Sequence, residues 1–243
     1  MDRELKEISV KLYEENIRDV IGDSLHPGGL DLTKRAVEVA RISMGKVLDI
    51  ACGAGASVRF IAENFGCEVI GVDLSAKLIE IARDTAKKPF IGGVEFIIGD
   101  AESLPFINSC FDTVICESAL SLFLDKSKVL REIYRVLKSG GRLVATNIVL
   151  KKNMPAELKR GLEFALCIAG AETLERFNKL FEQAGFVDVY IEDHSEKLIS
   201  IGLKLLLSDS LTKIFSVDVL ELALKKLFKG DMIGYAIIMA SKP

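Results

Sequence analysis

The chain has 243 residues, of which 49% are hydrophobic and 28% charged, and its net charge is −3 at pH 7. A chain of this length and composition is expected to fold into one large α/β domain. Acidic and basic residues are mixed along the sequence, so the basic surface that nucleic-acid binding requires is not predicted. We therefore do not expect RNA or DNA as a partner.

Compartment and membrane association follow from the same composition. No apolar run reaches the roughly 18 residues that span a membrane, so stable membrane insertion is not expected, and the charged N-terminal residues argue against a secretory signal. The five cysteines are scattered, without a C-x-x-C pair. This pattern indicates reduced thiols and no metal site. We expect a cytoplasmic protein that is a monomer or a homodimer.

The predicted elements begin with a helical spacing over residues 5–22, which a Pro-Gly loop at 25–29 ends. Asp31 is placed to cap a second helix that runs to about Ile42. Short apolar strands then alternate with amphipathic helices. The strands are predicted at 47–50, 68–72, 94–98, 113–116 and 142–149, and the helices at 57–65, 76–86 and 128–137. This alternation is typical of a parallel sheet covered on both faces, which right-handed crossovers make doubly wound.

The remaining third of the chain has a less regular pattern. Helices are predicted at 156–169, 174–184 and 198–228, and strands at 187–191 and 233–239. Two late strands separated by helices favour an antiparallel edge. The expected fold is therefore α/β, with a doubly wound, seven-stranded, mostly parallel sheet of the Rossmann-like type.

The first chemical signal lies in the loop after the first predicted strand. The loop reads Asp49-Ile50-Ala51-Cys52-Gly53-Ala54-Gly55 and leads into a helix. Two glycines let the backbone approach a ligand closely, and the amides at the start of the helix face the same ligand. A dinucleotide fingerprint would need a third glycine at Val58. The carboxylate of Asp49 also suits a cationic ligand better than a pyrophosphate.

Acidic residues also follow the next three strands. Asp73 ends the second strand, where a carboxylate can accept both hydroxyls of a ribose. Asp100 follows the third strand and can accept from the exocyclic amine of adenine. Glu117 ends the fourth strand, beside the first strand in space. Helix capping is the structural alternative for Asp73 and Asp100. Because ligands bind at the carboxyl ends of such strands, these positions together predict an adenosine site.

These motifs occur in a characteristic order. They are Asp49-x-x-x-Gly53-x-Gly55, Asp73, Gly99-Asp100-Ala101, Phe111-Asp112-x-Val114 and the Arg-Val-Leu-Lys-Ser-Gly-Gly run at 135–141. As a set they resemble the core of class I S-adenosylmethionine-dependent methyltransferases, and most of all the branch with the quinone C-methyltransferases and arsenite methyltransferases. The resemblance covers residues 25–150. It departs at Ala51, where the family most often has glycine.

The resemblance implies an enzyme that transfers a methyl group from S-adenosylmethionine to a small-molecule acceptor by direct displacement and leaves S-adenosylhomocysteine. The implied cofactor-binding residues are Asp49, Ala51, Cys52, Gly53, Gly55, Asp73, Leu74, Asp100, Ala101, Glu102 and Glu117. Glu117 is also a candidate catalytic residue near the transferred methyl, and His26 is a candidate general base. Asn147 and Cys167 are candidate substrate contacts. No metal is expected.

The same resemblance organises the chain as one methyltransferase domain over residues 1–243. Residues 1–44 are expected to supply N-terminal helices that act as a lid, residues 45–150 the cofactor-binding core, and residues 151–243 a helical insertion and the closing antiparallel strands. His194 lies at the end of a predicted strand and is expected to be solvated.

Two other functions stay open on the sequence alone. One is a nicotinamide-dependent oxidoreductase, which shares the glycine loop and the ribose-binding acid. The other is a non-catalytic module that binds S-adenosylmethionine or S-adenosylhomocysteine. Among methyltransferases, Cys167 before Gly170-Ala171 is faintly similar to arsenite enzymes, so an arsenite- or thiol-type acceptor is a secondary alternative. The core recognises the donor, so the acceptor and its reacting atom are left open.

Overall fold

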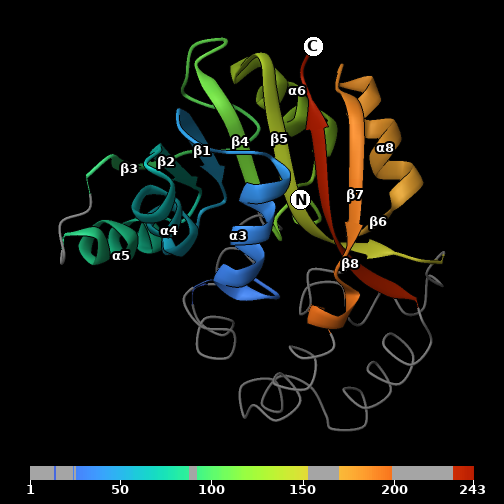
Figure 1. Cartoon of the computed structure of the whole chain (residues 1–243), viewed down its shortest axis with the longest axis horizontal. Helices are drawn as coiled ribbons and strands as arrows, with labels where there is room; N and C mark the ends of the chain where they lie inside the picture. The colour runs from blue at the N-terminus through green and yellow to red at the C-terminus, as the bar shows by residue number, and fades with distance from the viewer. Residues whose placement is uncertain (1–13, 15–23, 25, 88–91, 153–169, 199–231) are drawn as a thin grey trace, which may run out of the picture.

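A mostly parallel sheet forms the centre of the computed structural model, which describes residues 14, 24, 26–87, 92–152, 170–198 and 232–243 (Figure 1). Its strands are β1 (Lys46–Ile50), β2 (Glu68–Asp73), β3 (Val94–Ile98), β4 (Phe111–Glu117), β5 (Leu137–Leu150), β7 (Val187–Asp193) and β8 (Ile233–Ser241). Their order is β3-β2-β1-β4-β5-β8-β7, and β8 is antiparallel to both of its neighbours. The predicted seven-strand arrangement is confirmed. The two-residue strand β6 (Glu172–Thr173) pairs with β5 outside this order.

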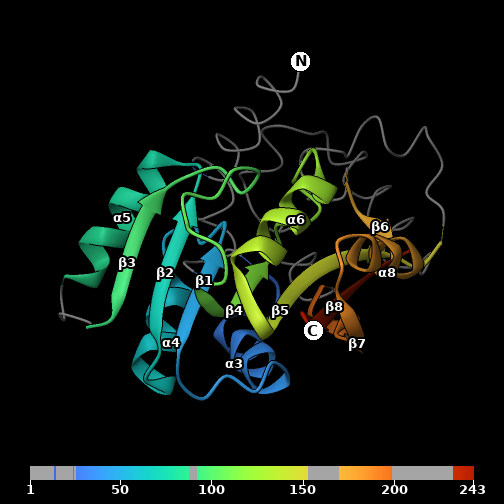
Figure 2. The same cartoon turned by 90° about the horizontal axis from the view of Figure 1, so that it is seen from above.

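Helices cover both faces of the sheet. They are α3 (Gly29–Val39), α4 (Ala56–Phe65), α5 (Ala76–Ala86), α6 (Lys126–Val136) and α8 (Leu174–Gln183). The apolar sides of α3, α4 and α5 pack into one core cluster, and those of α6 and α8 pack into a second cluster. Figure 2 shows α3 and α4 on one side of the sheet and α6 and α8 on the other. None of the described helices is long and apolar enough to cross a bilayer.

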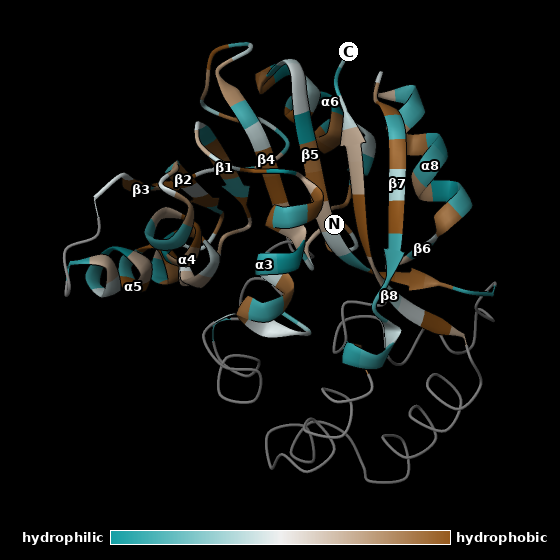
Figure 3. Ribbon diagram, viewed as in Figure 1, coloured by the Kyte–Doolittle hydropathy of each residue, from teal (hydrophilic) through white to brown (hydrophobic). Residues whose placement is uncertain are grey.

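The central strands are buried on both faces, which explains their continuous apolar sequences. Every residue of β1 after Lys46 is buried, and so are most residues of β4 and β8. Hydrophobic colour follows β8 in Figure 3, whereas β5 and α8 show hydrophilic segments between their hydrophobic ones. Phe177, Leu180 and Phe181 form the buried side of α8. Burial of these side chains provides the main driving force that fixes the helices on the sheet.

Several predicted element boundaries differ from those observed, and β5 begins at Leu137, five residues before its predicted start. Helix α3 begins at Gly29, and its N-cap is Gly28 with φ of 84° and no side-chain cap, so Asp31 lies in the first turn and does not cap the helix. Helix α6 ends at Val136, because Leu137 already pairs with Phe111 in the sheet. A register shift in β4 follows this pair. The predicted helices at 5–22, 156–169 and 198–228 lie wholly or almost wholly outside the described residues.

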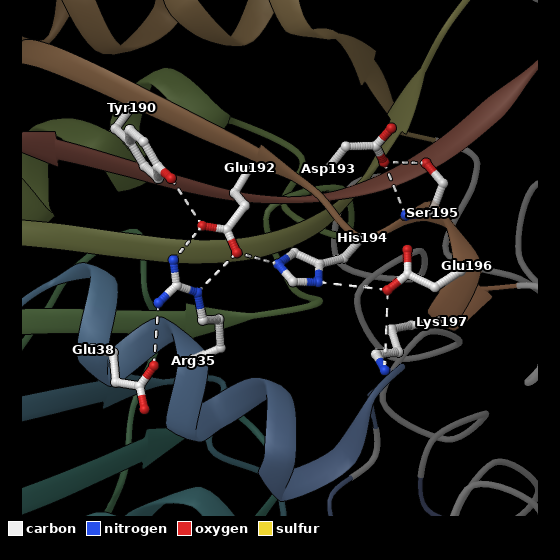
Figure 4. Close-up of polar contacts among 9 residues, drawn as sticks. All are labelled: Arg35, Glu38, Tyr190, Glu192, Asp193, His194, Ser195, Glu196 and Lys197. Atoms are coloured by element: carbon white, nitrogen blue, oxygen red, sulfur yellow. Dashed lines mark hydrogen bonds and ion pairs between the residues drawn. The ribbon is translucent and has the colours of Figure 1, made fainter.

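Helix α3 is also tied to β7 by a polar cluster (Figure 4). The Nε and Nη2 atoms of Arg35 donate to the two carboxylate oxygens of Glu192, at 2.9 and 2.8 Å. Tyr190 donates to the same carboxylate, and the Nε2 atom of His194 lies 2.8 Å from it. His194 is therefore partly buried in this cluster, and the expectation of a solvated side chain is wrong. The cluster connects the start of the described chain to its last third.

The Glu192 cluster predicts a pH-dependent contribution to stability. Hydrogen bonding from Arg35, against the effect of burial and with further bonds from Tyr190 and His194, lowers the pKa of Glu192 to about 2. A depressed carboxyl pKa stabilises the fold above the ordinary value, and this contribution is lost as pH falls toward the folded-state value. We expect Glu192→Gln to lower the melting temperature by about 1–2 °C at pH 7, because the pair is partly exposed.

Calorimetry at several pH values checks this prediction. The difference between the wild type and Glu192→Gln should stay constant down to about pH 5 and shrink between about pH 4.5 and pH 3. Glu38→Gln removes an exposed partner of the same Arg35 and should have a smaller effect. A wild-type advantage that is undiminished at pH 3 would contradict the prediction.

Candidate active site

A cavity lies at the carboxyl ends of β1, β2, β3 and β4, where the topology of the sheet predicts a ligand. Segments from five parts of the chain line it. The lining residues are Ser24, His26, Asp49–Gly53, Ser57, Val72–Ser75, Leu78, Gly99–Glu102, Glu117–Ala119 and Leu122–Leu124. Every predicted cofactor-binding residue except Gly55 is in this set. His26 is also there, so the structure brings the two candidate catalytic residues together.

The loop after β1 owes its shape to backbone conformations that favour glycine. Gly53 and Gly55 have φ values of 55° and 75°. A Cβ atom on Gly55 would lie 2.5 Å from the ring of Phe96, so no larger residue fits there without a shift. Gly55 therefore acts through packing beneath the cavity and not through its wall. Cys52 is also packed, since a Cβ on Gly71 would meet its Sγ atom at 2.7 Å.

Asp73 joins the glycine loop to the end of β2. Its Oδ2 atom accepts from the amide of Gly53 at 2.8 Å, and its Oδ1 atom accepts from the amide of Ser75 at 2.9 Å. The N-cap of α5 is Ser75, not Asp73, because the hydroxyl of Ser75 accepts from Leu78. Burial raises the pKa of Asp73, although the bonds from Ser75 and Gly53 oppose this effect. Each carboxylate oxygen keeps a lone pair for a hydroxyl group in the cavity.

Asp49 presents a different situation in the same wall. Its side chain is at the end of β1 and only 2% of the residue is exposed. Burial, with repulsion from Glu117 and Asp73, raises the pKa of Asp49 well above its ordinary value. Within the described part of the chain, no hydrogen bond or ion pair reaches its carboxyl group. A buried acid of this kind favours a ligand that brings a positive charge.

Glu117 lies at the end of β4 and is surrounded by donors. Ser57 donates to its Oε2 atom at 2.5 Å, and Thr33 lies 3.1 Å from both carboxylate oxygens. The Nε2 atom of His26 is 3.3 Å from Oε2. Burial would raise the pKa of Glu117, but the charge of His26 and the hydrogen bonds from His26, Ser57 and Thr33 lower it below its ordinary value. Glu117 is thus held as a carboxylate.

The wall after β3 is formed by Asp100, Ala101 and Glu102. The Oδ1 atom of Asp100 accepts from the amide of Glu102 at 2.9 Å. Helix α6 supports this loop, because Glu132 accepts from the amide of Leu104 at 2.8 Å. Leu74, which also lines the cavity, remains 42% exposed and offers an apolar surface. An acid beside an apolar surface suits a nucleobase, because the acid can accept from its polar edge and the apolar surface can cover its ring.

Of the two candidate substrate contacts, Asn147 lies outside the cavity wall and Cys167 lies outside the described residues. Asn147 is fully buried in β5 and is not part of the cavity wall. Its Oδ1 atom accepts from the amide of Ser121 at 3.3 Å, and its Nδ2 atom donates to the carbonyl of Ile148 at 2.8 Å. It supports the loop after β4. Cys167 lies outside the described residues, among which no cluster of metal ligands occurs.

Sequence reasoning missed several residues of the site. Thr33 and Ser57 contact Glu117 from α3 and α4, and no local pattern points to either residue. Ser118 has a φ of 54°, and its hydroxyl contacts that of Tyr235 in the core. Positive φ in a residue with a side chain often accompanies a functional site. The apolar run Leu122–Leu124, which is part of the cavity lining, was also not predicted.

The conformation of Ala51 leads to a stability prediction. Its φ is 60°, which places a residue with a Cβ atom in the left-handed region. Ala51→Gly should relieve about 1–2 kcal/mol of strain and lose about 0.4–1 kcal/mol through the more flexible unfolded chain. We expect a net gain of about 0.5–1 kcal/mol in the free energy of unfolding, measured with urea. Ala54→Gly in the same loop is the control and should lose stability. Equal losses in both variants would contradict the assignment of strain.

The comparisons with known proteins agree with this geometry. The profile of the family described as "Methyltransferase domain" matches residues 43–185. Methyltransferase GfsG of Streptomyces halstedii is 30% identical over 232 residues, which cover 91% of this chain and 83% of that protein. Phosphoethanolamine N-methyltransferase 3 of Arabidopsis thaliana is 29% identical over 182 residues, which cover 72% of this chain and 35% of that protein. The chain therefore spans about a third of the length of such plant relatives.

Solved structures share the fold over nearly the whole chain. Phosphoethanolamine N-methyltransferase 2 of Haemonchus contortus, in complex with phosphomonomethylethanolamine and S-adenosylhomocysteine, has a TM-score of 0.79 at 23% identity, over 96% of this chain and 57% of that one. The [4+2]-cyclase SpnF has a TM-score of 0.78 at 24% identity, over 97% of both chains. The family profile spans more than half of the sequence, and the match to GfsG extends over most of both proteins. The chain belongs to the class I S-adenosylmethionine-dependent methyltransferase family.

Proposed function

We propose that this chain transfers the methyl group of S-adenosylmethionine to a small-molecule acceptor by direct displacement. The observation that carries the proposal is the buried carboxyl group of Asp49, which faces the cavity beside the glycine loop without a donor from the described residues. A ligand with an ammonium and a sulfonium group supplies the positive charge that this position favours. A dinucleotide pyrophosphate would meet repulsion there.

The remaining walls fit the other parts of the same ligand. Asp73 would accept from the ribose hydroxyls, since both of its oxygens have free lone pairs. Asp100 and the backbone at Ala101 would meet the polar edge of adenine, and Leu74 would cover its ring. Cys52, Gly53 and Glu102 complete the wall. These assignments follow from chemical fit and agree with the positions that the sequence motifs predict.

The protein contributes to the reaction mainly by orientation. The bound cofactor supplies an electrophilic methyl group on a positively charged sulfur. Asp49, Asp73 and Glu117 hold fixed negative or acceptor groups around the cavity. Direct displacement then needs the acceptor atom in line with the methyl carbon. The chain supplies this alignment through the shape of the cavity.

The acceptor is expected to carry an apolar portion. The lining of the cavity also includes the apolar residues Ala119, Leu122, Phe123 and Leu124, and the ion pair of His26 and Glu117. An apolar wall of this kind binds aliphatic or aromatic surface and orients it through few polar contacts. This composition supports a small molecule over a nucleic acid or a protein segment. Asn147 is not expected to contact the acceptor, because its amide is engaged within the sheet.

We also propose that residues 1–243 form one domain that acts in the cytoplasm as a monomer or a homodimer. The separated, reduced cysteines support the compartment. The nicotinamide alternative is disfavoured because Val58, at the position of the third fingerprint glycine, fills the core beneath the loop with 0% exposure. The alternative of a non-catalytic module is distinguished from a methyltransferase by experiment, because proteins of other activity share this fold.

Two measurements test the function itself. Calorimetry should detect binding of S-adenosylmethionine and S-adenosylhomocysteine but not of NADH. Transfer of tritium from the labelled methyl donor should then appear with at least one member of a panel of phenols, thiols, amines and arsenite, preselected by thermal shift with S-adenosylhomocysteine present. Binding of NADH alone would overturn the proposal. Cofactor binding without transfer to any acceptor would favour the non-catalytic module.

Asp49 leads to a prediction about affinity. Asp49→Asn removes the charged acceptor and should weaken S-adenosylmethionine binding by about 10–100-fold, as expected for a hydrogen bond to a charged group of about 1.5–3 kcal/mol. Isothermal titration calorimetry measures the change. Asp84→Asn removes an equal charge from an exposed site on α5 and serves as the control with unchanged affinity. Unchanged affinity in Asp49→Asn would remove Asp49 from its assigned role.

Asp49 also predicts a linkage between binding and protons. Burial and the acidic neighbours raise the pKa of Asp49 in the free protein, which favours the neutral form of its carboxyl group. A cationic ligand favours the charged form and therefore releases a proton on binding. We expect affinity to rise with pH through the pKa of Asp49. Titrations in two buffers of different ionisation enthalpy should reveal the released proton, and Asp49→Asn should abolish it.

A further inference from the structure

We propose that His26 works as a protonated positioning residue that holds Glu117 in the cavity wall, and does not act as the general base that its loop position suggests. The inference rests on the proposed function, because it assigns a role within the same cavity. In this role His26 carries a positive charge, whereas a general base must be neutral in order to accept a proton. The two roles need opposite protonation states of His26, so pH separates them.

The hydrogen-bond partners of the imidazole carry this inference. Its Nδ1 atom lies 3.2 Å from the carbonyl oxygen of Pro27, which can only accept, so this nitrogen carries a proton. Its Nε2 atom lies 3.3 Å from Oε2 of Glu117 and 3.3 Å from Oγ1 of Thr33. An ionised carboxylate also only accepts. Both ring nitrogens are therefore placed as donors, which is the pattern of an imidazolium.

The hydroxyl groups nearby agree with this assignment. Thr33 and Ser57 each have one hydroxyl proton, and each is within donating distance of Glu117. With its proton directed to Glu117, the oxygen of Thr33 is left to accept from His26. Three donors thus converge on one carboxylate from α3, α4 and the loop before α3. Removal of the proton from Nε2 would place a lone pair against the carboxylate and would break this arrangement.

The electrostatic surroundings favour the protonated ring. His26 is 3% exposed, and burial alone would lower its pKa, but the charge of Glu117 and hydrogen bonds to Glu117 and Pro27 raise the pKa above the ordinary 6.5. The titratable groups that face this cavity are Asp49 from β1, Cys52 from the glycine loop, Asp73 from β2, Asp100 and Glu102 from the loop after β3, and Glu117 from β4. Those that carry charge are acidic, so none opposes the imidazolium.

The consequence for function is a requirement for protonated His26. The ion pair fastens the segment that includes Ser24 and His26 to the end of β4, and it keeps Glu117 ionised and immobile in the cavity wall. As pH rises through the raised pKa of His26, this fastening is lost and cofactor affinity should fall. A general base at the same position would become active over that interval. The gain of affinity with pH assigned to Asp49 and the loss assigned to His26 have different origins, and the variants Asp49→Asn and His26→Gln separate them.

Nuclear magnetic resonance of the free protein tests the protonation state directly. The chain has only two histidines, so His194→Gln assigns the imidazole signals without ambiguity. We expect both ring nitrogens of His26 to show imidazolium chemical shifts at pH 7, where an unperturbed histidine is mostly neutral. Shifts of a neutral tautomer at pH 7 would overturn the proposal. This measurement needs neither cofactor nor acceptor, so its outcome is independent of whether methyl transfer occurs.

Variants then test the role in the site. His26→Gln keeps a donor without the charge and should raise the dissociation constant for sinefungin about 10-fold at pH 7, with no further loss at alkaline pH. His26→Lys should restore part of the affinity and shift the alkaline loss of affinity, the alkaline limb of the pH profile, to higher pH. Thr33→Val removes a neutral donor and should leave that limb in place. Wild-type affinity that rises through the alkaline interval, or a limb that persists in His26→Gln, would contradict the assignment.

Discussion

Three buried carboxyl groups share one cavity, and the structure accommodates them by giving each a different environment. Glu117 is ionised against His26, Thr33 and Ser57, whereas Asp73 accepts from two backbone amides. Asp49 has neither kind of partner among the described residues. Burial and repulsion from neighbouring acids both oppose ionisation here, and Asp49, which has no such partner, has its pKa raised well above the ordinary value. A ligand with a positive charge would supply the partner that Asp49 lacks among the described residues.

The backbone around the cavity is shaped for the same purpose. Strands β1 and β4 are each followed directly by a residue of positive φ, namely Ala51 and Ser118, and the glycine loop adds two more such positions. These conformations turn the chain sharply, so that amides and side chains face the cavity at the strand ends. Local strain is tolerated because buried clusters on both faces of the sheet hold the strands in register. The rigid core thus supports a site whose chemistry lies in its loops.

In the function that we propose, different parts of the chain recognise the methyl donor and the acceptor. The donor side consists of turns after β1, β2 and β3, which the order of the sheet brings together. The proposed acceptor side consists of the segment before α3, which includes His26, and the loop after β4, which includes the apolar Leu122–Leu124 run. This division explains how relatives with different acceptors share one fold. The Arg35–Glu192 contact further joins α3 to β7, while Thr33 on the same helix contacts Glu117 at the end of β4.

The sequence alone determined the order of strands and helices, the glycine loop and the positions of Asp49, Asp73 and Asp100, because periodicity and turn residues are local properties. Only the tertiary structure decided that Glu117 has Thr33 and Ser57 as partners, 84 and 60 residues away in the chain. It also placed Asn147 inside the sheet and ended α6 one residue before the predicted boundary, where pairing with β4 outweighs helical propensity. Partners distant in sequence leave no local pattern, since crossovers and packing bring them together.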